Sequence, residues 1–173
     1  MHSFTLITAL LASSASLASA GRATINNYCG YNVVVTHVDG NGQQAGATIG
    51  SNGGVYSEDI NGSGVSLKLT LDGNVYAGNV SLSPKSSFAL SCSPLLTLHQ
   101  ENELDYSLAT GQYGGLYWNF GSNGAPFQGQ GLEAISSNPA NKVVCPAGST
   151  SCPGGTQWAD PTSDLTVNLC RTD

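Results

Sequence analysis

The sequence predicts an all-β fold of the sandwich or barrel type, because short β-rich runs alternate with turn residues and no sustained helical pattern occurs. The clearest runs are Asn32–Val38, which is rich in valine, and Val65–Leu71, in which every second residue is apolar. β-branched side chains favour extended backbone, and alternation places one face of a strand against a core. The other predicted strands are Ala23–Asn26, Val75–Gly78, Ser87–Ser91, Leu95–Glu101, Leu104–Ala109, Gly115–Phe120, Gly131–Ile135 and Leu165–Leu169.

Residues 1–20 have the features of a cleaved signal peptide. An apolar run from Phe4 to Leu11 is too short to cross a bilayer, and Ala18-Ser19-Ala20 provides the small residues that signal peptidase requires. We therefore expect a secreted protein that begins at Gly21, with residues 21–173 forming one domain.

Sparse, acidic charge excludes several classes of partner. The chain has 5 Lys and Arg against 11 Asp and Glu, a net charge of −6. Because Lys68, Lys85 and Lys142 form no cluster, neither nucleic acid nor an anionic membrane is an expected partner. Isolated histidines, His37 and His99, and the lack of paired C-x-x-C spacing give no reason to expect a metal or another cofactor.

Five cysteines in a secreted chain predict two disulfides with one cysteine left over. A bond between Cys29 and Cys170 would join the two ends of the domain, and one between Cys145 and Cys152 would close a short loop, which leaves Cys92. Sequence alone leaves the pairing open. The loop between Cys145 and Cys152 lies within Val143–Asp164, a segment that we expect to be a loop-rich excursion from the sheets. Two N-glycosylation triplets begin at Asn61 and Asn79.

Four short motifs resemble those of a known family. They are Ala23–Cys29 with the valine run after it, Asp105–Leu108, Tyr117–Gly121 followed by Ala125–Gly129, and Leu165–Cys170. In order and spacing they resemble secreted thaumatin-like proteins, and most closely the fungal Blastomyces yeast-phase-specific protein family. The resemblance implies a thaumatin-like β-sandwich with a Cys29–Cys170 bond.

Some thaumatin-like proteins bind or slowly cleave β-1,3-glucan in an acidic cleft, and this chain keeps little of that cleft. Asp105 matches the cleft glutamate, but the next two carboxylate positions fall on Asn119 and near Asn123, and the cleft arginine has no counterpart. Glycoside hydrolysis requires two carboxyl groups. The resemblance therefore implies binding more readily than hydrolysis.

A row of acidic residues and a group of aromatic residues remain as candidate sites. If the chain stays extended, period-two spacing places Glu101, Glu103 and Asp105 on one face, either as a weak catalytic row or as an ordinary solvated face. In the neighbouring strand the same period turns Trp118 and Phe120 into the core and leaves Tyr117 and Asn119 outside.

The expected function is that of a non-enzymatic protein at the cell wall or the host interface, with β-glucan as its candidate ligand. Aromatic faces stack on sugar rings while amides bond to their hydroxyls, so Tyr117, Asn119 and Asn123 are the candidate ligand-binding residues. The alternatives are a weak endo-β-1,3-glucanase that uses Asp105 with Glu103 or Glu101, and a secreted effector that binds a host protein.

Overall fold

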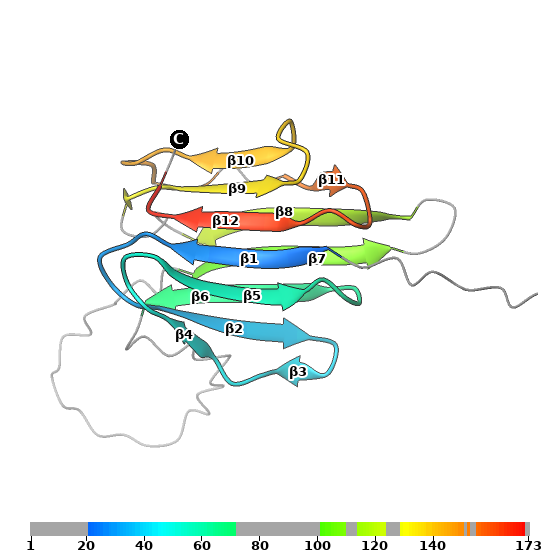
Figure 1. The fold of residues 1–173 in the computed structure, drawn as a ribbon, viewed down its shortest axis with the longest axis horizontal. Helices are drawn as coiled ribbons and strands as arrows, with labels where there is room; N and C mark the ends of the chain where they lie inside the picture. Colours follow the sequence, from blue (N-terminus) through cyan, green and yellow to red (C-terminus); the bar gives the residue numbers. More distant parts are fainter. Residues whose placement is uncertain are drawn as a thin grey trace, which may run out of the picture.

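The computed structural model describes residues 21–71, 101–109, 114–123, 129–150, 152 and 155–171, and they form two β-sheets packed face to face (Figure 1). None of the described segments is a helix long and apolar enough to cross a membrane. The five-stranded sheet has the order β10 (Lys142–Cys145), β9 (Leu132–Ser136), β12 (Leu165–Leu169), β1 (Arg22–Asn27) and β5 (Gly54–Asp59). The seven-stranded sheet has the order β11 (Gln157–Ala159), β8 (Gly115–Asn123), β7 (Glu101–Ala109), β6 (Val65–Leu71), β2 (Val33–Asp39) and β3 (Gly42–Gln43), with β4 (Ala47–Ile49) also paired to β2.

The first and last strands of the fold lie side by side in the five-stranded sheet. β1 and β12 pair in parallel, from Ala23 opposite Leu165 to Asn27 opposite Leu169. Directly after both strands, Cys29 and Cys170 form a disulfide with 5.1 Å between their Cα atoms. The Cys145–Cys152 bond is also present and closes the loop after β10. Both expected disulfides are thus confirmed, and Cys92 lies outside the described residues.

A single core fills the space between the sheets. Alternate residues of the central strands, such as β1, β6 and β12, point inward, which is the period-two pattern that the sequence shows most clearly in β6. The largest fully buried side chains of the seven-stranded sheet are Trp118, Tyr106 and Phe120, and they face Ile25, Leu132 and Leu165 of the other sheet. The all-β, two-sheet prediction is confirmed.

A hydrogen-bonded cluster around Glu58 joins the two sheets at their β5 and β2 side. Glu58 on β5 accepts hydrogen bonds from Tyr106 on β7 and from Tyr56, the latter at 2.5 Å. Its carboxylate also contacts Nδ1 of His37 on β2 at 3.0 Å, and Nε2 of that ring lies 3.6 Å from Asp39. Burial and the Glu58 carboxylate raise the pKa of both tyrosines, which therefore remain donors. This cluster was not predicted from the sequence, in which His37 is isolated; in the fold His37 has two acidic neighbours, Asp39 and Glu58.

Several sequence-based boundaries were wrong. The expected break between Leu95–Glu101 and Leu104–Ala109 does not exist, because β7 runs unbroken from Glu101 to Ala109. The excursion Val143–Asp164 contains part of β10 and all of β11, so it is less loop-rich than expected. β3, β4 and β5 were not predicted, since their glycines and exposed polar residues hide the alternation. Val75–Gly78, Ser87–Ser91, residues 95–100, Asn79 and the signal segment 1–20 lie outside the described residues.

The two disulfides are expected to stabilise the fold by different amounts. In the chain-entropy model a sequence separation of 141 residues corresponds to about 5 kcal/mol, and one of 7 residues to about 2.5 kcal/mol. The double variant Cys29→Ser/Cys170→Ser should therefore lose about twice as much unfolding free energy as Cys145→Ser/Cys152→Ser in guanidinium denaturation. Equal losses would contradict this assignment.

Glu58→Gln is expected to destabilise the fold by about 2–3 kcal/mol, because it removes the charge that three donors share. Its neighbour Asp59→Asn is the matched control, since the Asp59 side chain is 75% exposed against 17% for Glu58. Thermal denaturation of both variants measures the difference. A similar, small effect of the two substitutions would show that the cluster does not hold the sheets together.

Candidate functional site

The outer face of the seven-stranded sheet carries the residues that the sequence nominated. On β8, Trp118 and Phe120 are fully buried, whereas Tyr117 is 38% exposed and Asn119 half-buried. The predicted alternation is therefore confirmed. A role of Tyr117 and Asn119 in binding remains a prediction.

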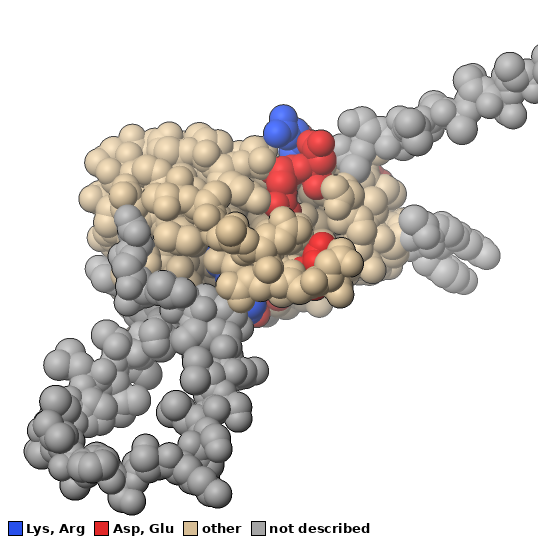
Figure 2. All heavy atoms as spheres, turned by 90° about the horizontal axis from the view of Figure 1, so that it is seen from below, with Lys and Arg blue, Asp and Glu red and all other residues tan. Residues whose placement is uncertain are grey.

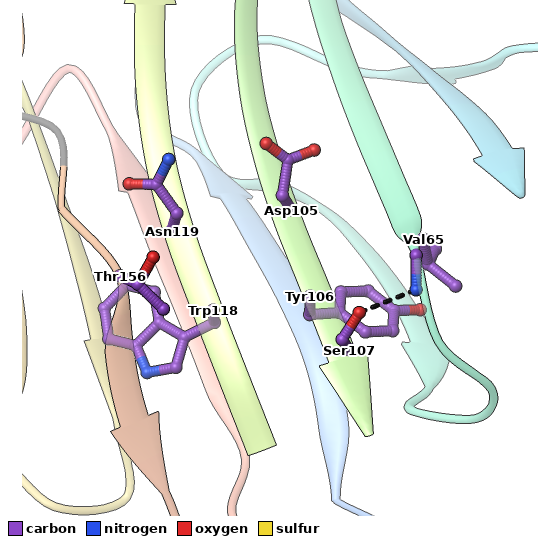
Figure 3. Close-up of a pocket in the computed structure, with 8 residues that line it drawn as sticks. Val65, Asp105, Tyr106, Ser107, Trp118, Asn119 and Thr156 are labelled. Atoms are coloured by element: carbon purple, nitrogen blue, oxygen red, sulfur yellow. Dashed lines mark hydrogen bonds between the residues drawn. The ribbon is translucent and has the colours of Figure 1, made fainter. Parts of the chain in front are cut away.

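A groove of about 260 Å³ opens on this face between β6, β7 and β8. The register places Asp105 of β7 directly opposite Asn119 of β8, and Ser107 opposite Tyr117. Figure 3 shows Asp105, Asn119 and Ser107 on neighbouring strands, with Thr156 beside β8. The full lining consists of these four residues, Gly64 at one rim, and the buried positions Val65, Tyr106 and Trp118 below.

An exposed aromatic pair, Tyr117 and Trp158, lies next to the groove. Trp158 on β11 is opposite Tyr117 in the register, and 49% of its surface is exposed. Its indole packs over Gly115, where an added Cβ would come within 2.1 Å of Nε1. Asn141 donates a 2.5 Å hydrogen bond to the Trp158 carbonyl oxygen. Glycine at position 115 therefore leaves the space in which the indole packs against the sheet.

Asn119 presents its amide to the groove in a fixed orientation. Its Oδ1 accepts a hydrogen bond of 3.0 Å from the Gly155 backbone nitrogen. This bond directs the amide nitrogen to the other side, toward Asp105, as Figure 3 shows. A donor and an acceptor thus lie next to each other on the groove surface, an arrangement suited to a hydroxyl group.

Asp105 is the ionisable group inside the groove. Burial raises its pKa, the neighbouring Glu103 raises it further, and Ser66 and Lys68 offset the rise in part. Glu103 lies on the same face but forms an ion pair with Lys68. The Lys68 Nζ is 2.5 Å from the Glu103 Oε2. Glu103 and Asp105, two of the three acidic residues that were expected to share a face, therefore do so, and Lys68 pairs with Glu103.

The remaining candidates lie further along the same two strands. Glu101 at the start of β7 pairs with Asn123 at the end of β8, four residues from the Asp105–Asn119 pair. Only their backbone positions are described, so their part in a site remains a prediction.

Figure 2 views the molecule from the side of β2, β3 and β4, where most of the described surface in view carries no charge. Among the described residues, no three His, Cys, Asp or Glu side chains are placed so that they could hold a metal ion.

Sequence reasoning missed Trp158, Ser107 and Thr156. Trp158 lies in a segment interpreted as loop, and the short alternating run Gln157–Ala159 after Gly155 was its one local signal. Ser107 and Thr156 are ordinary polar residues, and only strand pairing brings them to the groove.

Comparisons with known proteins agree with the fold. Residues 10–171 match the family model described as Bys1, Blastomyces yeast-phase-specific protein. Among solved structures, the protein elicitor MoHrip2 from Magnaporthe oryzae is similar with a TM-score of 0.52 and 16% sequence identity, over 88% of this chain and 100% of that one. No curated protein matches the chain. At this identity the structural likeness concerns the fold alone.

Asp105→Asn is expected to stabilise the protein at neutral pH. A carboxyl group whose pKa is raised on folding favours the native state while it is protonated, and this contribution is lost as the pH rises through the folded-state pKa. The variant should therefore have a higher melting temperature than the wild type at pH 7, with a difference that shrinks as the pH falls toward about 4. Asp59→Asn serves as the control, because the Asp59 side chain is exposed. A variant that is less stable at pH 7 would contradict the assigned burial of Asp105.

Proposed function

The chain belongs to the Blastomyces yeast-phase-specific protein family, and on this premise we propose that it is a secreted, non-enzymatic fungal protein that binds β-glucan at the cell wall or the host interface. The groove and the aromatic pair are its ligand-binding site. The proposal includes the cleavage of residues 1–20 and the assignment of the two-sheet fold as a thaumatin-like β-sandwich.

The observation that carries the proposal is the position of the aromatic pair beside a hydrogen-bond donor and a hydrogen-bond acceptor. Tyr117 and Trp158 are partly exposed aromatic residues, and an aromatic ring can stack on the apolar face of a pyranose. Asn119 supplies a donor, and Asp105 supplies an acceptor opposite it. Ser107 adds a hydroxyl at the next register position. Few polar groups around an apolar platform are the usual composition of a small-ligand site.

Charge supports an uncharged polymer as the ligand. The net charge of −6 repels anionic polysaccharides and nucleic acid, whereas a neutral glucan feels no such field. Asp105 is held partly desolvated, and a sugar hydroxyl can donate a hydrogen bond to it in place of water. A neutral glucan therefore suits both the surface and the groove.

The carboxyl groups of the groove support binding over hydrolysis. Glycosidases use one carboxyl group as an acid and a second as a base or nucleophile. Asp105 faces the amide of Asn119, which cannot take the second role, and Glu103 is paired with Lys68. A weak hydrolase that uses Asp105 and Glu103 would have to break this ion pair first.

Two disulfides support a location outside the cell, since such bonds persist in oxidising compartments. The similar fold of MoHrip2, described as a protein elicitor, fits a protein that acts at a host interface. Recognition of a host protein is the alternative if no polymer is bound.

Trp158→Ala and Tyr117→Ala are each expected to weaken retention on insoluble β-1,3-glucan by about 1 kcal/mol, roughly fivefold. Tyr28→Ala is the matched control, because Tyr28 is 41% exposed and lies at the end of β1, away from the groove, with Arg171 over its ring. Depletion from the supernatant measures binding, with chitin and cellulose in parallel.

Release of reducing ends is assayed in the same incubations. Release that disappears in Asp105→Asn would replace the binding proposal by the glucanase alternative. An absence of retention on every polymer would end the glycan proposal and leave the host-protein alternative.

A further inference from the structure

We propose that Asn61 carries an N-linked glycan that lies at the rim of the groove and limits access of a polymer to it. This inference rests on the proposed function, because it concerns regulation of the same binding site. The second triplet, at Asn79, lies outside the described residues and serves below as a control.

The triplet Asn61-Gly62-Ser63 is accessible for modification in the folded chain. Asn61, Gly62 and Ser63 are all exposed, in the loop that leads from β5 to β6. Gly62 has a φ of +73°, a backbone conformation that disfavours any side chain at the middle position. A bulky, hydrophilic glycan requires a surface loop of this kind.

The loop is held by three hydrogen bonds, two of which tie it to β7 at the end of the groove. The Leu108 backbone nitrogen donates to the Gly62 carbonyl oxygen at 2.9 Å, and the Gly64 nitrogen donates to Ser107 Oγ at 2.7 Å, the bond drawn in Figure 3. On the other side, the nitrogen of buried Ile60 donates to the Gly21 oxygen at 2.8 Å. These bonds hold the loop in one position relative to β7.

Asn61 is therefore close to the ligand-binding residues. Gly64 and Ser107 both line the groove, and Ser107 pairs with Tyr117 of the aromatic pair. Gly64 is three positions after Asn61 in the chain, which limits the distance between their Cα atoms to about 10 Å. The first sugars of a glycan on Asn61 lie within reach of the rim.

The glycan acts on the groove in two ways that add up. It excludes a long polymer from the rim by its volume, and its own pyranose rings can stack on Tyr117 and Trp158. A tethered group of this kind has an effective concentration on the order of millimolar, so even weak stacking competes with free polymer. The groove is then less accessible to a polymer in the glycosylated protein than in the unmodified one.

The test uses full-length protein from a host that attaches N-glycans. Asn61→Gln and Ser63→Ala each remove the triplet by a different side chain, and Asn79→Gln removes the other triplet. Occupancy is determined from the mass of the intact glycopeptide, because Asn-Gly bonds also deamidate spontaneously. Retention on β-1,3-glucan is then measured for each protein.

Both Asn61→Gln and Ser63→Ala should bind about tenfold more tightly than the wild type, the factor expected when a tethered competitor is present at roughly ten times its own dissociation constant. Asn79→Gln should bind as the wild type does. Trimming the glycan to its first sugar on the folded wild-type protein should recover most of the gain, which separates occlusion from an effect of the substitutions on folding.

The outcomes distinguish the inference from the function on which it rests. If Asn61 is not glycosylated, or is glycosylated while wild type and Asn61→Gln bind equally and Trp158→Ala still loses binding, the glycan inference fails alone. If Asn61→Gln and the trimmed protein are not retained on glucan either, the proposed function fails with it.

Discussion

Parallel pairing of β1 with β12 is the constraint on which the rest of the structure depends. It brings residues near both ends of the chain into the middle of the five-stranded sheet, and the Cys29–Cys170 bond fixes this closure. Parallel neighbours require a long connection between them, and here it contains the whole seven-stranded sheet together with β5, β9 and β10. With a loop of this length, the bond contributes about 5 kcal/mol, comparable to the entire net stability of many domains.

The two sheets then hold each other through apolar contacts and one polar cluster. Trp118, Tyr106 and Phe120 are the largest buried side chains of the seven-stranded sheet. They belong to β7 and β8, so the strands that carry the groove on their outer face are also the best anchored in the core. Glu58 accepts hydrogen bonds from Tyr106 on the same strand as Asp105. A rigid β7 keeps Asp105 opposite Asn119, and rigid placement of this kind reduces the entropy lost on binding.

The groove combines features that do not serve stability. Asp105 is partly desolvated, which raises its pKa and costs stability when it is ionised, while Tyr117 and Trp158 expose ring faces to water. A ligand that covers these groups offsets the free energy lost through their desolvation and exposure. Their presence in one place is therefore typical of a binding site. The loop that carries Asn61 meets the same place, so the glycan that we propose on Asn61 would lie beside the site.

The sequence by itself determined the all-β class, the inward turn of Trp118 and Phe120, and the outward turn of Tyr117 and Asn119, because period-two alternation is a local property of a strand. It also nominated both disulfide pairs and Asp105. Only the tertiary structure decided that Asp105 lies opposite Asn119, that Trp158 joins Tyr117, and that His37 meets Glu58. These contacts join residues between 14 and 41 positions apart, and strand pairing over such distances depends on the order of strands in the sheets, which no local pattern encodes.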